Sequence, residues 1–482
     1  MIADDWSPLL EDLATRHRAA EAMGGPDRLA HLAERRRLDV RTRIDRLVDA
    51  GSFVEYGVLV GSVPRGALPP APADAFVMGH ATVEGRPVVV GAADPTVMGG
   101  SVGPGTIAKR RRLIELARLI GAPVVWLLDG PGRRTQHPND ATPGAVDELR
   151  DLASLSSTST VVAAVLGPVA GHDALVVGCA NHVVMTRSAA VFAAGPPLVR
   201  AALGLEVTAG ELGGPEVHPG GFVDHVADDE VAALAHIRAR LAGLGPTSAP
   251  HPAATSRPGA RAVLPADPGR GYDLDALLAT LADAGSWCRD GEARCALVTG
   301  TLEVGGVELA VVASDPSVDD GRIDVAAAEG ARRRFERAAD TSTPVLVLAD
   351  TTGPAIGPEA ERSGTVPAVA RLLRAANDHP GPILAVVVRR AHGDVPSVLG
   401  FGSTARVLVS LALPGARLGP LPAETASAAV ARPADVAALV EHTEFGGAVD
   451  AADRLTVDRV VDPGAVRAEL DAALRRWGGL RG

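Results

Sequence analysis

Aromatic residues and cysteines are scarce in this chain of 482 residues. Phe, Trp and Tyr together make up 3% of it, whereas hydrophobic residues as a whole make up 46%. The core must therefore consist mainly of Val, Leu and Ala, as in a parallel sheet that helices cover on both faces. Cys179, Cys288 and Cys295 are too few for a disulfide framework and lack the spacing of a zinc site, so we expect structural thiols and no metal.

The chain also has no long apolar run and no long run of one charge. No stretch approaches about 18 uninterrupted apolar residues, and no basic flank leads into an apolar stretch at the N-terminus, which predicts a cytoplasmic protein without membrane contact. The net charge of −11 is spread along the chain, which argues against nucleic acid binding. Arginine runs at residues 35–37, 110–112 and 332–334 should lie on solvated helix faces, with contact to an anionic ligand as the alternative.

An internal repeat organises what is present. GRPVVVGAADPTVMGG, which starts at Gly85, returns as GVELAVVASDPSVDDG, which starts at Gly306, at a separation of 221 residues. We therefore predict two homologous α/β halves, with any chemistry where such halves face each other. The residues that align at this separation are Asp94 with Asp315, Asp129 with Asp350, Ala170 with Ala391, and Asp173 with Asp394.

The pattern along the chain predicts four regions. Residues 1–50 form an N-terminal helical arm, residues 51–246 the first half, residues 247–270 a linker rich in Pro, Ala and Ser, and residues 271–482 the second half. A strand, an amphipathic helix and a strand in that order imply parallel crossover connections in each half. The predicted strands are residues 87–93, 123–128, 160–166, 308–313, 344–349 and 382–388, and the predicted helices are residues 106–121, 271–285, 325–339, 435–442 and 466–477.

The third predicted strand of each half runs into a turn that contains glycine. These turns lie in GPVAGHDALVVG, residues 167–178, and RRAHGDVPSVLG, residues 389–400. Consecutive backbone N–H groups in such a turn can hold the oxyanion that develops on a thioester carbonyl. An ordinary tight connection between strand and helix is the alternative, and finding the turn at equivalent places in both halves makes the functional interpretation equal to it.

At this point the chain resembles a known family, the carboxyltransferase β subunits of biotin-dependent acyl-CoA carboxylases of the propionyl-CoA carboxylase type. The resemblance begins near Arg35 and runs to about Ala429. Its most specific part is the ordered series FAAGPPLV, ELGGPEVH and DHVADDE in the first half. It implies two tandem crotonase-like halves, a dimer-based hexamer, and active sites between the first half of one chain and the second half of its partner.

The resemblance also implies two facing oxyanion holes. The hole of the first half, which holds the enolate of the acyl thioester, falls on Gly171 and His172. The hole of the second half, which holds the biotin ureido oxygen, falls on Gly393, Asp394 and Val395. Further substrate contacts are expected at Gly99, Gly100, Ser101, Lys109, Gly132, Arg133, Arg134, Gly353 and Ser397.

The site loops depart from the family pattern. His172 and Asp394 stand where the family has glycine, Pro131 replaces another glycine, and Pro396 removes an amide donor. His172 is either a general acid or hydrogen-bond donor in the acyl hole, or a partly exposed turn residue. Asp129 and Asp350 are expected to brace loops. Arg133 and Arg134 are expected either to contact a phosphate or to lie in solvent. His392 is expected to be the counterpart of Gly171.

Lys109 is the only lysine of the chain. It lies where the family has a lysine near the coenzyme A entrance, so a phosphate contact is expected. It is not in the Met-Lys-Met context of a biotin attachment site, and no biotin carboxylase segment is present, so biotin must arrive on a separate carrier protein.

Three hypotheses remain open. The first is a carboxyltransferase subunit that acts on an acyl-CoA or acyl-carrier-protein thioester with a biotin carboxylase and a biotin carrier as partners. The second is a repurposed enzyme that performs decarboxylation or other enolate chemistry without biotin. The third is a paralogue without catalysis that forms a hetero-oligomer with an active β subunit.

Overall fold

The computed structural model of the chain describes residues 6–62, 71–134, 145–156, 158–218, 222–243, 259–267, 269–291, 294–356, 358–393, 399, 406–419 and 447–478. The described residues form two compact units. The first unit comprises residues 16–250, and the second comprises residues 251–478 together with the first fifteen residues of the chain.

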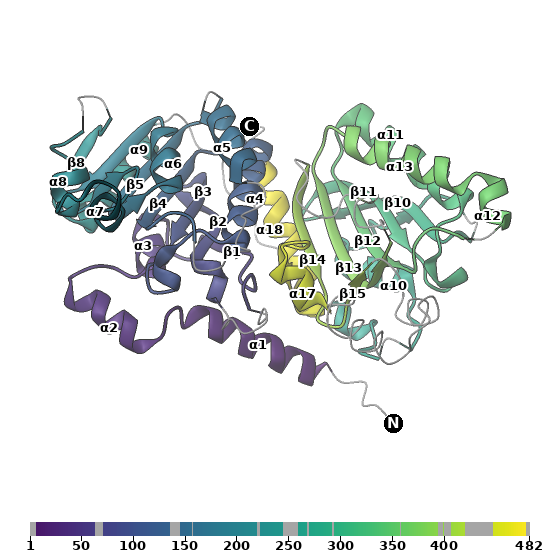
Figure 1. Ribbon diagram of the computed structural model, residues 1–482. Helices are drawn as coiled ribbons and strands as arrows, with labels where there is room; N and C mark the ends of the chain where they lie inside the picture. Colours follow the sequence, from purple (N-terminus) through teal and green to yellow (C-terminus); the bar gives the residue numbers. More distant parts are fainter. Residues whose placement is uncertain are drawn as a thin grey trace. The chain divides into compact units, whose positions relative to one another are not determined.

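One sheet of eight described strands forms the centre of the first unit (Figure 1). Its order is β1-β2-β3-β4-β5-β6-β8, with β7 beside β5. The pairs β1/β2 and β2/β3 are antiparallel, and every pair from β3 to β8 is parallel. The strands are β1 (Val54–Tyr56), β2 (Phe76–Val83), β3 (Arg86–Ala93), β4 (Val124–Gly130), β5 (Val161–Ala170), β6 (His182–Thr186), β7 (Ala190–Phe192) and β8 (His225–Ala227).

Local signals begin and end the helices of this unit. The Asp39 carboxylate accepts the N–H groups of Arg41 and Thr42 at the start of α3, and α4 begins with proline at its first position. Gly121 ends α4 in the left-handed conformation. The helices from the N-terminus to the end of this unit are α1 (Ser7–Glu21), α2 (Pro26–Glu34), α3 (Val40–Leu47), α4 (Pro104–Ile120), α5 (Ala145–Ser156), α6 (His172–Gly178), α7 (Pro196–Leu203), α8 (Ala209–Gly213) and α9 (Glu230–Ala242).

Helices cover both faces of the sheet. Ile44 of α3 and Ile237 of α9 pack in one buried cluster with alternate strand residues such as Val90 and Leu127. On the other face, a β-carbon added to Gly91 would lie 2.9 Å from Leu113 of α4 and 3.0 Å from Trp126. The strand residues are thus buried on both sides, which explains their nearly continuous hydrophobic character.

The second unit repeats this topology. Its order is β16-β14-β13-β12-β11-β10-β9, with β15 beside β13. The strands are β9 (Cys288–Arg289), β10 (Leu297–Val304), β11 (Val307–Ser314), β12 (Val345–Thr351), β13 (Ile383–His392), β14 (Val407–Ala412), β15 (Arg417–Gly419) and β16 (Arg459–Val460). The helices are α10 (Leu274–Leu281), α11 (Val325–Thr341), α12 (Pro358–Ser363), α13 (Thr365–Asp378), α17 (Ala448–Asp453) and α18 (Val466–Gly478).

The predicted strands are confirmed as β3, β4, β5, β11, β12 and β13, of which β5 and β13 extend to Ala170 and His392, beyond the predicted ends. The sequence interpretation missed β2 and β10, the antiparallel partners of β3 and β11. Two-residue turns, Glu84-Gly85 and Gly305-Gly306, connect these pairs, and such glycine turns are a hairpin signal. The predicted helix at residues 435–442 lies outside the described residues.

The structure corrects one part of the repeat alignment. β4 pairs with β5 through Val124 and Val161, and β12 pairs with β13 through Val345 and Ile383, so the third strand is displaced by 222 residues rather than 221. The second unit has one more residue between these strands. Gly171 therefore corresponds to Gly393, and His392, which was expected to match Gly171, corresponds to Ala170.

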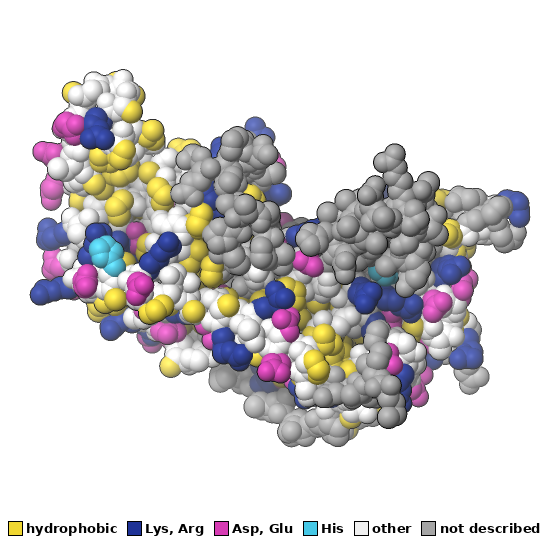
Figure 2. Space-filling model, turned by 60° about the horizontal axis from the view of Figure 1, so that its bottom comes forward, with side chains coloured by type: hydrophobic (Ala, Val, Ile, Leu, Met, Phe, Trp, Pro, Cys, Tyr) yellow, Lys and Arg dark blue, Asp and Glu magenta, His cyan; other side chains and the backbone are white. Residues whose placement is uncertain are grey.

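Both signs of charge occur on the face drawn in Figure 2, where Lys and Arg side chains are interspersed with Asp and Glu. The described part of the chain contains no helix long and apolar enough to cross a bilayer. Within the same residues, no three His, Cys, Asp or Glu side chains are arranged so that they could hold a metal ion. The three cysteines are free thiols.

Candidate active site

Backbone segments meet closely at the carboxyl end of β4. The amide of Val102 donates to the carbonyl of Gly132 at 2.8 Å, and the amide of Arg134 donates to the carbonyl of Val102 at 2.8 Å. A β-carbon on Gly100 would lie 2.3 Å from the carbonyl oxygen of Asp129, and the φ of Gly100 is 74°. Only glycine permits this approach, which fixes the segment after β3 against the loop after β4.

The same loop lies against the turn after β5. A β-carbon on Gly132 would lie 2.4 Å from the carbonyl oxygen of Ala170 and 3.3 Å from the amide nitrogen of His172. The structure thus brings together most of the site residues predicted for the first half. They are Gly99, Gly100, Ser101, Gly132, Arg133, Arg134, Gly171 and His172.

The amide of Gly171 is already engaged in this turn. Gly171 has φ 55° and ψ −115°, and its N–H donates to the carbonyl of Phe192 on β7 at 3.1 Å. It is therefore not available to a thioester oxygen, which corrects the expectation that both Gly171 and His172 donate. The backbone N–H groups of His172 and Asp173 have no acceptor among the described residues.

The side chain of His172 is withdrawn from solvent. Its Nε2 lies 2.5 Å from Oε2 of Glu148 on α5, and its side chain is 5% exposed. The ring is therefore neither a partly exposed turn residue nor a free hydrogen-bond donor in the hole. The His172 side chain is thus bonded to Glu148 on α5 and not to the backbone N–H groups of its own turn.

Arg110 of α4 lies beneath this turn. Its Nη1 contacts Oδ1 of Asp173 at 2.6 Å, and Glu148 lies 3.9 Å away. The guanidinium stands over the ring of Phe76 at 5.0 Å. Burial would lower the pKa of Arg110, but the carboxylates of Asp173 and Glu148 raise it above its ordinary value.

These contacts correct the interpretation of residues 110–112 as a solvated helix face. Arg110 and Arg112 are buried, whereas Arg111 is 41% exposed. Sequence periodicity missed this because an arginine can be buried only where carboxylates from other elements meet it, and those elements lie far away in the sequence.

Arg134 and Asp74 join the loop to the start of α4. Nη1 of Arg134 lies 2.8 Å from Asp74, and its Nε donates to the hydroxyl of Ser101 at 3.1 Å. The second oxygen of the Asp74 carboxylate accepts the N–H of Thr106 at 2.7 Å. Arg134 thus positions the loop, while Arg133 is exposed and has no ion-pair partner among the described residues.

Lys109 does not reach the surface, which corrects the expected phosphate contact. Its side chain is fully buried, and its Nζ donates to the carbonyls of Ala73, at 3.0 Å, and Phe76. Burial lowers the pKa of Lys109 to about 8, against the opposing effect of Glu55 and Asp74. The lysine therefore holds the turn before β2, where Ala73, Asp74 and Ala75 all have positive φ.

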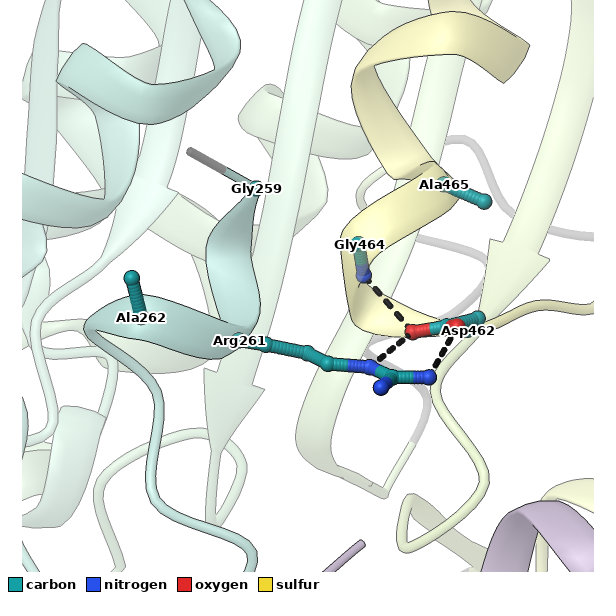
Figure 3. A pocket seen from close by; sticks show the side chains of 6 residues that line it. All are labelled: Gly259, Arg261, Ala262, Asp462, Gly464 and Ala465. Carbon is teal, nitrogen blue, oxygen red and sulfur yellow. Dashed lines mark hydrogen bonds and ion pairs between the residues drawn. The ribbon is translucent and has the colours of Figure 1, made fainter. Parts of the chain in front are cut away.

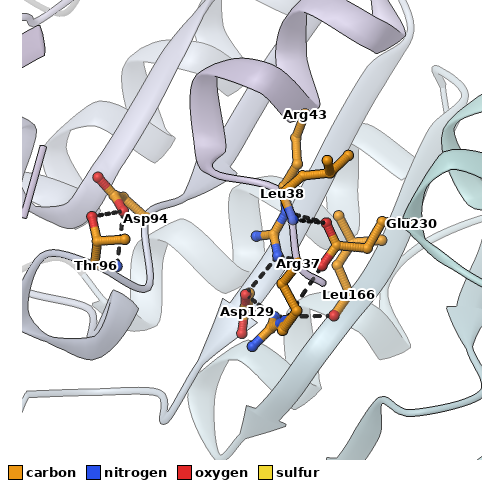
Figure 4. A network of polar contacts seen from close by, with 8 residues as sticks. All are labelled: Arg37, Leu38, Arg43, Asp94, Thr96, Asp129, Leu166 and Glu230. Carbon is orange, nitrogen blue, oxygen red and sulfur yellow. Dashed lines mark hydrogen bonds and ion pairs between the residues drawn. The ribbon is translucent and has the colours of Figure 1, made fainter. Parts of the chain in front are cut away.

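A buried ionic network braces the carboxyl end of β4 (Figure 4). Nη2 of Arg43 lies 2.9 Å from Asp129 and 2.7 Å from Glu230, at the start of α9, and Arg37 also pairs with Asp129. Burial would lower the pKa of Arg43, but Asp129 and Glu230 raise it above its ordinary value. The prediction that Asp129 braces a loop is confirmed.

The second unit has an equivalent arrangement. A β-carbon on Gly353 would lie 3.3 Å from the carbonyl of His392, and the N–H of Gly393 donates to the carbonyl of Gly419 at 2.9 Å. Asp350 contacts Arg390 at 2.9 Å and the hydroxyl of Tyr272 at 3.1 Å, so its expected bracing role is confirmed. The remaining predicted site residues, Asp394, Val395 and Ser397, lie outside the described residues.

A separate cavity of about 660 Å³ lies elsewhere in the second unit (Figure 3). Gly259, Gly464 and an ion pair between Arg261 and Asp462 line it, with Nε of Arg261 2.6 Å from the carboxylate. The charges neutralise each other, and none of the predicted site residues lies there. This cavity is therefore not the candidate active site.

The amides of His172 and Asp173, at a glycine turn of one of two similar halves, are of the kind that stabilises an enolate oxygen, and this defines an enolate-stabilising type of enzyme with two crotonase-like halves. Residues 33–476 match the carboxyl transferase domain, and the chain belongs to that family. The predicted class of enzyme, a carboxyltransferase, is confirmed.

The chain is similar to several known proteins over nearly its whole length. It is 28% identical to the methylmalonyl-CoA carboxyltransferase 12S subunit of Propionibacterium freudenreichii subsp. shermanii, over 99% of this chain and 95% of that protein. It is 29% identical to the propionyl-CoA carboxylase beta chain of Cereibacter sphaeroides, over 96% and 95%. The fold matches the beta subunit of geranyl-CoA carboxylase of P. aeruginosa with a TM-score of 0.81 and 23% identity, over 98% of this chain and 92% of that one.

Proposed function

We propose that this chain transfers a carboxyl group to the α-carbon of an acyl thioester, as the carboxyltransferase subunit of a biotin-dependent acyl-CoA carboxylase. The observation that carries this proposal is the turn after β5. There the amides of His172 and Asp173 have no acceptor among the described residues, while the His172 side chain is held away by Glu148. The relatives include biotin-dependent acyl-coenzyme A carboxylase subunits.

The carbonyl oxygen of the thioester is proposed to accept a hydrogen bond from the backbone N–H of His172. Negative charge develops on this oxygen when the α-proton leaves, so an amide that already points at it stabilises the enolate more than the bound substrate. Gly132 lets the loop after β4 approach the turn closely, which fixes one wall of the site. No side chain of the described turn is free to act as the base, because His172 and Asp173 are both paired.

Arg133 is the candidate for a contact with a phosphate of coenzyme A or of a carrier-protein arm. It is exposed, lies directly after Gly132, and has no carboxylate partner among the described residues. Guanidinium groups bind phosphates through two parallel hydrogen bonds, which suits a residue at the mouth of a thioester site.

The carboxyl group would come from biotin on a separate carrier protein. Gly353 and Gly393 fit that role, because both have positive φ and a β-carbon on Gly353 would lie 3.3 Å from the carbonyl oxygen of His392. We propose that amides after Gly393 hold the biotin ureido oxygen, at Asp394 and Val395, with Ser397 beside the acyl group. The partners would then be a biotin carboxylase, a biotin carrier protein, and further copies of this chain or a related β subunit.

A carboxylation assay tests the function. The purified chain is incubated with a biotinylated carrier and its carboxylase, ATP, bicarbonate and a panel of acyl-CoA and acyl-carrier-protein thioesters, and every thioester product is identified by mass spectrometry. A malonyl-type product that requires the biotinylated carrier supports the proposal. Thioester turnover without biotin would replace it with a repurposed enolate enzyme, and absence of all turnover would replace it with a scaffold role.

A further inference from the structure

Four ionisable side chains form a buried cluster beneath the turn after β5. Arg110, Glu148 and Asp173 are fully buried, and the ring of His172 is nearly so. Glu148 contacts His172 at 2.5 Å, and Arg110 contacts Asp173 at 2.6 Å. The two contacts hold consecutive residues of the turn, one from α5 and the other from α4.

The second unit shows that the fold does not require this cluster. It builds the same strand, glycine turn and preceding helices, with Gly393 in the place of Gly171. Ala331 stands on α11 where Arg110 stands on α4, and Val369 and Ala370 occupy the part of α13 that corresponds to Glu148. The described positions of the second unit that correspond to Arg110 and Glu148 therefore carry no charged side chain.

Burial of these ionisable side chains also carries an energetic cost that apolar side chains would not have. Burial of a charge costs on the order of several kcal/mol per ion before ion pairing offsets this penalty. A protein with apolar side chains of equal volume in the same place is often more stable. The offset here is incomplete, because Nε and Nη2 of Arg110, Oε1 of Glu148 and Oδ2 of Asp173 lack hydrogen-bond partners among the described residues. A stabilising role alone does not account for the cluster, whereas holding the turn in one orientation does.

We propose that Glu148 and Arg110 are positioning residues for the acyl-thioester site. Glu148 holds His172 and Arg110 holds Asp173, so the two turn amides keep the direction needed to stabilise an enolate oxygen. Arg110, Glu148, His172 and Asp173 together form this clamp. The catalytic part of the inference rests on the proposed function, whereas the clamp itself does not.

The clamp is tested first without any ligand. Hydrogen exchange of the peptide that covers residues 171–176 is measured by mass spectrometry in the full chain and in Glu148→Gln, which keeps the shape but removes the charge. Exchange in this peptide is expected to rise about tenfold or more as the turn opens locally, with little change in β3 and β4. Equal exchange in both proteins would overturn the clamp.

The catalytic consequence is tested with two coenzyme A thioethers, one bearing a nitroalkyl group whose nitronate mimics an enolate and one bearing a plain alkyl group. The ratio of their dissociation constants measures enolate selectivity. Glu148→Gln and Arg110→Met are expected to lower that selectivity roughly tenfold while plain alkyl binding changes little, because the lost interaction favours the enolate. The control is Asp151→Asn, which removes a half-buried carboxylate between the same two helices.

The outcomes separate the two levels of the inference. Selectivity that is unchanged in both variants would overturn the positioning role even if the turn exchanges faster. Absence of nitronate selectivity in the unmodified chain would overturn the proposed function and the positioning role with it, leaving the exchange result to decide the clamp. If Arg110→Met unfolds, the shape-conserving Glu148→Gln decides alone.

Discussion

Gly121 and Ser342 end equivalent helices in the two units with the same left-handed backbone. Gly121 has φ 63° and ψ 22° after α4, and Ser342 has φ 53° and ψ 30° after α11. Glycine adopts this conformation without strain, whereas a residue with a β-carbon loses about 1 kcal/mol or more there. The repeat thus supplies a matched pair for measuring backbone strain in one chain.

Ser342→Gly is expected to raise the free energy of unfolding of the second unit by about 0.5–1 kcal/mol, because the strain is relieved. Gly121→Ser is expected to lower that of the first unit by a similar amount. Urea denaturation followed by circular dichroism measures both. A loss of stability in Ser342→Gly would contradict the assignment of strain to this position.

His379 should make the stability of the second unit depend on pH. It is fully buried beside Phe335, and burial lowers its pKa to about 4, with the nearby Thr343 backbone opposing this effect and Arg406 acting in the same direction. The unfolded chain therefore binds more protons between pH 6.5 and 4, so stability falls as pH falls through this window.

Replacement of His379 by Leu should flatten that part of the pH dependence. Between pH 7 and pH 5 the free energy of unfolding of the unmodified chain is expected to fall by on the order of 2 kcal/mol more than that of the variant. Urea midpoints at the two pH values give the difference. Parallel curves for the two proteins would show that the folded histidine titrates normally.

At the scale of elements, the network around Asp129 ties α3 and α9 to the end of β4. Arg43 is completely buried and contacts both Asp129 and Glu230. Arg43→Met would leave two buried carboxylates with only Arg37 as an ion-pair partner among the described residues, and breaking such a network costs roughly 3–5 kcal/mol. Thermal or urea unfolding measures the loss.

A surface ion-pair variant provides the comparison for Arg43→Met. Arg238 of α9 pairs with Asp49 and Glu84, and its side chain is 26% exposed. Arg238→Met is expected to cost under about 1 kcal/mol, because water screens exposed pairs. Equal losses in the two variants would mean that the Arg43 network is no more important than a surface pair.

At the scale of the whole molecule, a single lysine makes accessibility easy to measure. Lys109 is buried and its ammonium is held by two backbone carbonyls. An amine-reactive ester at neutral pH is therefore expected to leave Lys109 unmodified in the folded chain and to modify it in urea. Peptide mass spectrometry distinguishes the two states. Rapid labelling of the folded chain would contradict the burial of Lys109 and support the phosphate contact expected from the sequence.

The duplicated architecture was predictable from the sequence because it rests on local and periodic signals. Apolar strands bounded by Gly, Pro and Asp, amphipathic helices, and the repeated Asp94 and Asp315 motif identify two α/β halves. The loops that form the candidate site could also be predicted from the sequence. Glycine is required wherever two backbones approach as closely as at Gly100 and Gly132.

Only the tertiary structure decided which polar groups are free. The sequence predicts that Lys109 and Arg110 lie on an accessible helix face and offers His172 as a hydrogen-bond donor in the acyl hole. Each side chain is instead buried against partners from other elements. The Gly171 amide is likewise engaged by β7, and the third strand of the repeat is displaced by one residue. Burial and pairing depend on which segments the fold brings together, and no local pattern encodes those distances.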